Sequence, residues 1–260
     1  MGYRVGVDVG GTFTDLVALD EASGRLHLLK RPTTPADQSE GVADGLRALL
    51  ALEGIPEGAV AYLAHGTTIC INAVLEKKGA ATGLVTTRGM RALLELRRQI
   101  RGDLYDLQAD KPEPLVPRPR RHEVAERIRF DGTVDEPLAL DEARRAIDEL
   151  VQDGVRALAV FFLHSYVNPA HERAVRELVA RHYPDLYLSI SSEVLPEFRE
   201  FERLSTTVLN AYVGPVMARY LGRLEERVRA LGLPAPYILQ SNGGVATASQ
   251  TRERPVFTMA

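Results

Sequence analysis

A glycine-interrupted pair of apolar runs opens the chain and limits its fold more than any other stretch. Residues 3–20 read YRVGVDVGGTFTDLVALD, in which three valines alternate with smaller or polar residues, Asp8 among them. Strict alternation is typical of a strand with one buried face, so Asp8 is expected on the face opposite the valines. The break at Gly10 and Gly11 predicts a tight hairpin turn.

The periodicity of the first third of the chain predicts an antiparallel meander followed by alternating helices and strands. Such an order implies an α/β fold with a mixed β-sheet and helices on its faces. Asp37 is the expected N-cap of the first helix. The expected strands are 3–9, 14–19, 25–31, 59–66 and 82–87, and the expected helices are 37–52 and 67–79.

The middle of the chain departs from this rhythm. Residues from about 98 to 137 are rich in proline and arginine, which disfavours both a helix and a central strand. We expect a surface excursion that ends in an edge strand, HEVAERIRF. Regular alternation then returns, with helices expected at 141–153, 169–182 and about 198–231, and strands at 156–163, 186–192 and 237–244.

Composition excludes several classes of function. The 260 residues carry a net charge of -3, which gives no reason to expect nucleic acid or an anionic membrane as a partner. Cys70 is the single cysteine, so a disulfide framework and a CxxC metal site are excluded, and a small buried residue is expected there. No apolar run is long enough to span a bilayer and no secretion signal is seen, which makes the cytoplasm the expected compartment.

The opening hairpin has the chemistry of a phosphate-binding turn. Gly10 and Gly11 allow positive φ angles and bring bare N–H groups close to a ligand, and the hydroxyls of Thr12 and Thr14 can add donors. A carboxylate repels phosphate unless a divalent cation lies between them, so Asp8 is expected to anchor Mg2+. The alternative is an ordinary glycine hairpin with incidental acids.

Five segments resemble, in order, the hydantoinase A/5-oxoprolinase family. They are VGVDVGGTFTDLV (5–17), the stretch from AHGTTICINAV to TTRGM (64–90), residues 103–128, VLPEFREFERLSTTVLNAYVGPVMARYL (194–221) and YILQSNGG (237–244). The first of these also resembles the first phosphate loop of the actin-like ATPase superfamily.

This resemblance implies an actin-like ATPase (ribonuclease H-like) lobe, with the opening meander, then alternating α and β, then the start of a second lobe. It implies a hydantoinase/oxoprolinase N-terminal domain at 1–197 and the beginning of a core domain at 198–260. It also implies a hydrolase that uses ATP and Mg2+ to open a cyclic amide, 5-oxoproline or a hydantoin, through phosphorylation of the carbonyl oxygen. The remainder of a longer polypeptide and a hydantoinase B-type subunit are the implied partners.

The motifs single out candidate site residues, although none is identified as the catalytic base. The nucleotide-side candidates are Asp8, Gly10, Gly11, Thr12, Thr14, Asp15, Asn242, Gly243 and Gly244. The substrate-side candidates are His65, Thr67, Thr68, Asn72, Arg199 and Arg203. Each segment also has a structural interpretation: helix capping and a core histidine at 65–72, a tight turn at 242–244, and a salt-bridged helix face in FREFER.

One departure from the superfamily pattern affects the predicted activity. No second Asp-Gly-Gly phosphate loop and no adenosine pocket follow residue 20. We therefore expect an N-terminal part of a longer enzyme, inactive in isolation because the opening hairpin supplies half of an ATP site. Two alternatives remain open, a subunit of an ATP-dependent ketone carboxylase and a non-catalytic nucleotide-binding relative.

Overall fold

The computed structural model divides into two compact units. The described residues are 2–34, 36–99, 105–106, 108 and 111–259. The first unit joins Met1–Gly79 to Val216–Ala260, and the second is the continuous segment Ala80–Pro215. The predicted family regions, 1–197 and 198–260, are a different kind of division and stay a prediction. No helix among the described residues has the length and apolar character needed to cross a bilayer.

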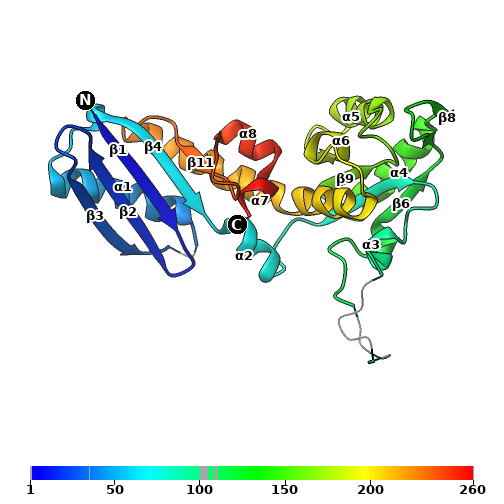
Figure 1. The fold of residues 1–260 in the computed structure, drawn as a ribbon, viewed down its shortest axis with the longest axis horizontal. Coiled ribbons are helices and arrows are strands. Elements are labelled where there is room, and N and C mark those ends of the chain that lie inside the picture. The colour runs from blue at the N-terminus through cyan, green and yellow to red at the C-terminus, as the bar shows by residue number, and fades with distance from the viewer. Residues whose placement is uncertain (1, 35, 100–104, 107, 109–110, 260) are drawn as a thin grey trace. The chain divides into compact units, whose positions relative to one another are not determined.

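A six-stranded mixed sheet forms the first unit (Figure 1). The opening meander of β1, β2 and β3 is antiparallel, as predicted. The later strands join the sheet beside β1, with β4 parallel to β1 and β11 parallel to β4. In sheet order the strands are β12 (Val245–Thr247), β11 (Tyr237–Leu239), β4 (Val60–Thr67), β1 (Tyr3–Val9), β2 (Phe13–Asp20) and β3 (Leu26–Pro32).

The helix α1 (Gln38–Glu53) packs on the valine face of this sheet. It begins where the Asp37 side chain accepts from the Ser39 N–H, so the predicted N-cap is confirmed, and it ends at Gly54 in the left-handed region. Its apolar stripe is buried with the inward side chains of β1 and β2, namely Val42, Leu46, Leu49 and Leu50 with Val5, Val7, Val9, Leu16 and Ala18. The other helical elements of this unit are α2 (Ile69–Leu75), α8 (Ala248–Glu253) and the part of α7 (Glu200–Ala230) from Val216 onward.

The second unit is built on a four-stranded sheet whose strands all run parallel. In sheet order they are β10 (Tyr187–Ile190), β9 (Ala157–Phe161), β5 (Thr82–Thr87) and β6 (Arg121–Val124). The central strands β9 and β5 are buried along their whole length, as expected for a parallel sheet covered on both faces. The unit also contains α3 (Leu93–Leu96), α4 (Leu140–Gln152), α5 (Ala170–His182), α6 (Ser191–Val194), the part of α7 up to Pro215, and the short hairpin of β7 (Arg127–Ile128) and β8 (Val134–Glu136).

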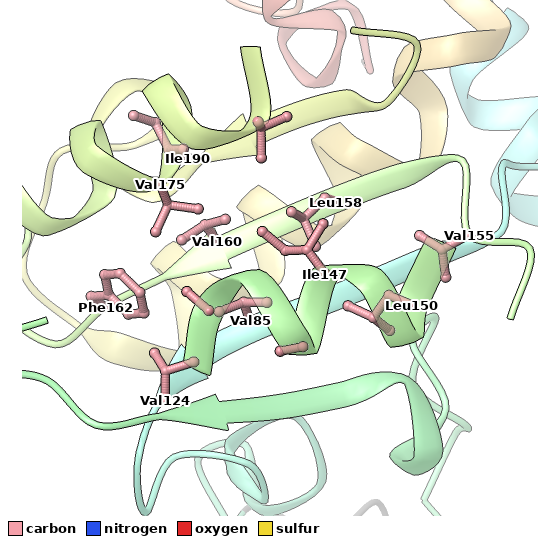
Figure 2. Close-up of a cluster of buried hydrophobic side chains, with 13 residues drawn as sticks. Val85, Val124, Ile147, Leu150, Val155, Leu158, Val160, Phe162, Val175 and Ile190 are labelled. Atoms are coloured by element: carbon pink, nitrogen blue, oxygen red, sulfur yellow. The ribbon is translucent and has the colours of Figure 1, made fainter. Parts of the chain in front are cut away.

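Two apolar layers hold the sheet of the second unit. On one face, Ile147 and Leu150 of α4 gather with Leu158 and Val160 of β9 and with Val175 of α5 (Figure 2). On the opposite face, side chains of α7 pack on the alternate residues of the same strands, namely Leu204, Val208 and Ala211 on Leu84, Ala157, Ala159 and Phe161. The central strands β5 and β9 therefore contribute apolar side chains in both directions.

Most predicted elements are present, with shifted ends. The edge strand expected after the proline-rich excursion, HEVAERIRF, is present as β6, but it ends at Val124, and Arg127–Ile128 form β7 of a separate two-stranded sheet. Part of the excursion (100–104, 107 and 109–110) lies outside the described residues. The helix expected at 67–79 extends only over Ile69–Leu75. The strand expected at 186–192 ends at Ile190 because α6 begins there, and the one expected at 237–244 ends at Leu239 because a turn follows.

Candidate functional site

Three predicted site segments meet at the carboxyl ends of three neighbouring strands of the first sheet. β1, β4 and β11 are parallel neighbours, with Val9 paired to Thr67 and Ile238 paired to His65. The carboxyl ends of parallel strands point the same way. The β1–β2 turn, the start of α2 and the β11–β12 turn, which follow these ends, are therefore neighbours. Thr68 joins the first two, since its backbone N–H and its hydroxyl both lie 3.4 Å from the Val9 carbonyl oxygen.

Two threonines, Thr14 and Thr33, support the β1–β2 turn. The Gly10 N–H donates to the Phe13 carbonyl at 3.0 Å, and the Thr33 hydroxyl donates to the Gly10 carbonyl at 3.0 Å. Thr14 is buried and its hydroxyl lies 3.1 Å from that of Thr33, so it supports the turn from the core side. Its predicted contact with phosphate remains a prediction.

The expected positive φ at this turn is wrong. Neither Gly10 nor Gly11 has its φ in the left-handed region. A side chain on Gly10 would bring its Cβ to 3.3 Å from the Phe13 carbonyl, and one on Gly11 would meet nothing within 4 Å. The double glycine therefore leaves the outer surface of the turn bare, together with the exposed Thr12, and this surface is open to a ligand.

Asp8 and Asp15 lie side by side on the open face of the sheet. They are paired across β1 and β2, and both side chains are exposed. Lys30 Nζ lies 2.9 Å from Asp15 Oδ1, whereas Asp8 has no ion-pair partner among the described residues. Both acids line a groove of about 610 Å3 that is otherwise mainly apolar, with Val17, Leu28 and Leu239 on its walls.

The carboxylate of Asp8 fits closely against β4. A Cβ built on Gly66 would lie 2.9 Å from Asp8 Oδ1, so the missing side chain at Gly66 makes room for the carboxylate. Among the described residues, no group of three or more His, Cys, Asp or Glu side chains could hold a metal ion. Asp8 thus offers a single carboxylate, which suits an Mg2+ ion whose other ligands are phosphate oxygens and water.

His65 lies inside the unit rather than on its surface. It is 1% exposed, and its Nε2 lies 2.7 Å from the Tyr220 hydroxyl of α7. Burial lowers the pKa of His65 to about 4, and burial also raises the pKa of Tyr220. The imidazole is therefore neutral at pH 7 and joins β4 to α7, while its predicted substrate contact remains a prediction.

The start of α2 combines the predicted capping threonines with Asn72. Thr67 Oγ1 accepts from the Ile69 N–H at 3.3 Å, whereas Thr68 makes no side-chain capping bond. The Asn72 amide donates to Thr68 Oγ1 at 3.2 Å. These side chains form a continuous polar wall from β4 into the helix.

The β11–β12 turn closes on itself. The Gly243 N–H donates to the Gln240 carbonyl, and Gly243 has a φ of 83°. The Gly244 N–H donates to Asn242 Oδ1 at 2.8 Å. Ser241 fixes the turn to the rest of the unit by donating from its N–H and its hydroxyl to the Phe257 carbonyl. The predicted tight turn is present, and its proposed contact with nucleotide is untested.

Arg199 and Arg203 belong to the second unit. Arg203 is 1% exposed, stacks against the rings of Phe161 and Tyr166, and donates to the Phe162 carbonyl at 3.0 Å. Burial lowers its pKa. Arg199 lies over the ring of Phe198 with φ at 77°. The structure thus gives Arg203 a place in the core, and the substrate role of both arginines stays a prediction.

Sequence reasoning missed several residues that shape the site, chiefly Lys30, Gly66 and Tyr220. Lys30 is paired with Asp15 across β2 and β3, which the predicted meander could have shown if its register had been worked out. Gly66 precedes the threonines at the end of a predicted strand, a position where glycine often marks close approach of other atoms. No local signal links Tyr220 to His65, because 155 positions separate them.

Comparisons with known proteins give the family. The model of the hydantoinase/oxoprolinase N-terminal region matches residues 4–183, and the hydantoinase/oxoprolinase model matches residues 203–260. The alpha subunit of caprolactamase from Pseudomonas jessenii is 38% identical over 98% of this chain, and 5-oxoprolinase of Saccharomyces cerevisiae is 28% identical over 93%. The chain spans 37% and 22% of the lengths of these two relatives.

Solved structures agree with these matches. The crystal structure of the ATP-dependent caprolactamase from Pseudomonas jessenii has a TM-score of 0.89 at 36% identity, covering 98% of this chain and 38% of that one. The nucleotide-free structure of acetone carboxylase has a TM-score of 0.87 at 26% identity, covering 99% of this chain and 38% of that one. The predicted fold class and the predicted resemblance are both confirmed. The chain belongs to the hydantoinase/oxoprolinase family and has the fold of an actin-like ATPase lobe.

Proposed function

We propose that this chain supplies one side of the ATP site in an enzyme that opens a cyclic amide. The observation that carries the proposal is the carboxyl edge of the first sheet, where a bare glycine turn lies directly after the strand that presents Asp8. Two relatives named for lactam hydrolysis, caprolactamase and 5-oxoprolinase, support the same reaction class.

The chemistry follows from the resistance of an amide carbonyl to water. Resonance stabilises the ring amide, and transfer of the terminal phosphoryl group of ATP to the carbonyl oxygen would make that oxygen a good leaving group. The protein then has to position the phosphates and neutralise their charge. The glycine turn and Thr12 would supply donors to phosphate oxygens, and the Asn242–Gly244 turn would border the same edge.

Asp8 would hold the metal ion in this site. Mg2+, when bound, would neutralise phosphate charge next to the carboxylate. Asp15 is less suited to this role because its carboxylate already pairs with Lys30. Placing Asp8 at the metal also explains why the adjoining position on β4 is glycine, since a side chain there would displace the carboxylate.

The test is ATP hydrolysis by the full-length protein in the presence of 5-oxoproline, hydantoin or caprolactam. We expect lactam-stimulated release of phosphate that falls by orders of magnitude in Asp8→Ala without loss of folding, because metal positioning is lost. Asp44→Ala is the matched control, since Asp44 is an exposed acid on α1 that pairs with Arg47 at the surface. A folded Asp8→Ala protein with near-normal turnover would refute the assignment.

A ketone carboxylase is the second candidate. The acetone carboxylase structure matches this chain at a TM-score of 0.87, and the gamma subunit of acetophenone carboxylase from Aromatoleum aromaticum is 32% identical. Phosphorylation of a carbonyl or carboxyl oxygen would use the same turn and the same Asp8. Stimulation of ATP hydrolysis by acetone or acetophenone with bicarbonate, and not by lactams, would favour this candidate.

A hydantoinase B-type subunit is a proposed partner for the lactam reaction.

A further inference from the structure

The four asparagines of the chain differ in the residue that follows each of them. Asn242 is followed by Gly243, whereas the others precede alanine, at Asn72 and Asn210, or proline, at Asn168. An asparagine before glycine is chemically labile, because the next backbone nitrogen can attack the side-chain amide carbon and glycine has no side chain to hinder it. Proline has no N–H to lose, so Asn168 lacks this route.

The fold separates Asn242 from the two asparagines that precede alanine. Asn72 lies within α2, and Asn210 is buried within α7. The backbone nitrogens that follow them belong to helices, so attack on the side chain requires the helix to open first. Asn242 lies instead in the β11–β12 turn, where residues 241–244 are all exposed. Of the four asparagines, Asn242 is therefore the one whose neighbouring nitrogen is free of regular secondary structure.

The geometry of the turn favours this attack. A Cβ built on Gly243 would meet nothing within 4 Å, so the space around the attacking nitrogen is open. The Gly244 N–H donates to Asn242 Oδ1 at 2.8 Å, and attack on Cγ places negative charge on this same oxygen, which the N–H would stabilise. One contact opposes the attack, since the Gly243 N–H donates to the Gln240 carbonyl at 2.9 Å. That hydrogen bond lies at the exposed surface, where local opening costs little.

We propose that Asn242 is a site of spontaneous deamidation. Hydroxide removes the proton of the Gly243 N–H, the nitrogen forms a bond to Asn242 Cγ, and the side-chain nitrogen takes up a proton and leaves as ammonia. One water molecule then opens the cyclic imide. Addition of water at Cγ gives aspartate, and addition at the backbone carbonyl carbon gives isoaspartate. The reaction needs no oxidant, reductant or cofactor.

Both products change the charge of the turn. Each adds a carboxylate, and isoaspartate also lengthens the backbone by one carbon. The proposed function places phosphate oxygens at the carboxyl ends of the neighbouring strands, so the new charge should weaken ATP binding by up to about fivefold. This consequence rests on the proposed function, whereas the modification itself does not depend on nucleotide.

The experiment follows the folded full-length protein in mildly alkaline buffer made with heavy-oxygen water. Peptide mass mapping then separates conversion during the incubation from conversion during digestion. We expect the peptide with Asn242 to gain the mass of a labelled hydroxyl in place of the amide nitrogen, with isoaspartate beside aspartate. Conversion at Asn72 and Asn210 should be at least about tenfold lower, because their helices must open first. Asn242→Gln is the matched control, since it keeps the side-chain amide but would have to form a larger ring, and its peptide should keep its mass.

Several outcomes would overturn the proposal. Asn242 that stays intact in the folded protein but is converted in urea would show that the turn protects it. Aspartate without isoaspartate would exclude attack by the Gly243 nitrogen, and equal conversion at Asn72 and Asn210 would exclude a role for the turn. Asn242→Asp tests the consequence by calorimetry with Mg2+ and ATP, and wild-type affinity in this variant would refute the effect on nucleotide. A wild-type protein that binds no ATP would count against the proposed function and not against the modification.

Discussion

Replacing Gly66 with alanine tests the position of Asp8 without touching its carboxylate. The new Cβ would lie 2.9 Å from Asp8 Oδ1, and ordinary van der Waals contact begins at 3.4 Å. The carboxylate must therefore move by about 0.5 Å. Displacement of a reacting group by about 1 Å can cost about 100-fold in rate, so we expect Gly66→Ala to lower kcat for ATP hydrolysis about tenfold.

Folding should be nearly unaffected by this change. Asp8 is exposed and its carboxylate is the mobile end of a side chain, so the expected loss in the free energy of unfolding is below about 1 kcal/mol. Gly6→Ala is the matched control, because Gly6 lines the same groove and its new Cβ would meet Val17 at 3.1 Å instead of Asp8.

A double-mutant cycle gives the decisive result. If Gly66→Ala acts through Asp8, it should cause no further loss of rate in an Asp8→Asn background. The measurements are kcat in the full-length protein with a lactam present and urea unfolding for each variant. A folded Gly66→Ala protein with the wild-type rate, or a tenfold loss that persists in the Asp8→Asn background, would refute the reasoning.

Two further predictions concern stability. Gly214→Ala should lower the free energy of unfolding by about 1–3 kcal/mol or more, because its Cβ would lie 2.1 Å from Tyr187 Cζ. Gly222→Ala on the same helix meets nothing within 4 Å and should raise the free energy of unfolding by up to about 1 kcal/mol. Equal urea midpoints for the two variants would contradict this prediction. Burial lowers the pKa of His65 from 6.5 to about 4, so on acidification the unfolded chain binds its proton first. Stability from this group should be constant above pH 6.5 and fall by up to about 3 kcal/mol by pH 4. Urea unfolding across that range, with His65→Asn as the reference, checks this, and parallel curves would count against it.

Local patterns in the sequence were enough to predict the opening meander and its bare turn. The alternation in residues 3–9 placed Asp8 opposite the valines, and Asp37 was recognised as a cap from its position before an apolar stripe. Both features depend on neighbours within a few residues. The edge position of β6 was likewise predictable because prolines precede it.

Long-range pairing set the limit of prediction. Periodicity could not show that β5 leaves the first sheet and starts a second one, since strand composition carries no record of its partners. The same limit hid the contact of His65 with Tyr220. The short hairpin of β7 and β8 was missed because two- and three-residue strands are too brief for periodicity to register.

The discontinuous first unit has a consequence for synthesis of the chain. β4 ends at Thr67, but its neighbour β11 begins only at Tyr237, after the whole of the continuous second unit. On the ribosome, Ala80–Pro215 is complete while the edge of β4 still presents unpaired backbone groups. The second unit can therefore fold early. Pairing of β11 with β4 completes the first sheet late, because the whole second unit lies between these two strands in the chain. Until Tyr237–Leu239 emerges, the nascent chain carries an open edge strand next to the β1–β2 turn proposed to bind nucleotide.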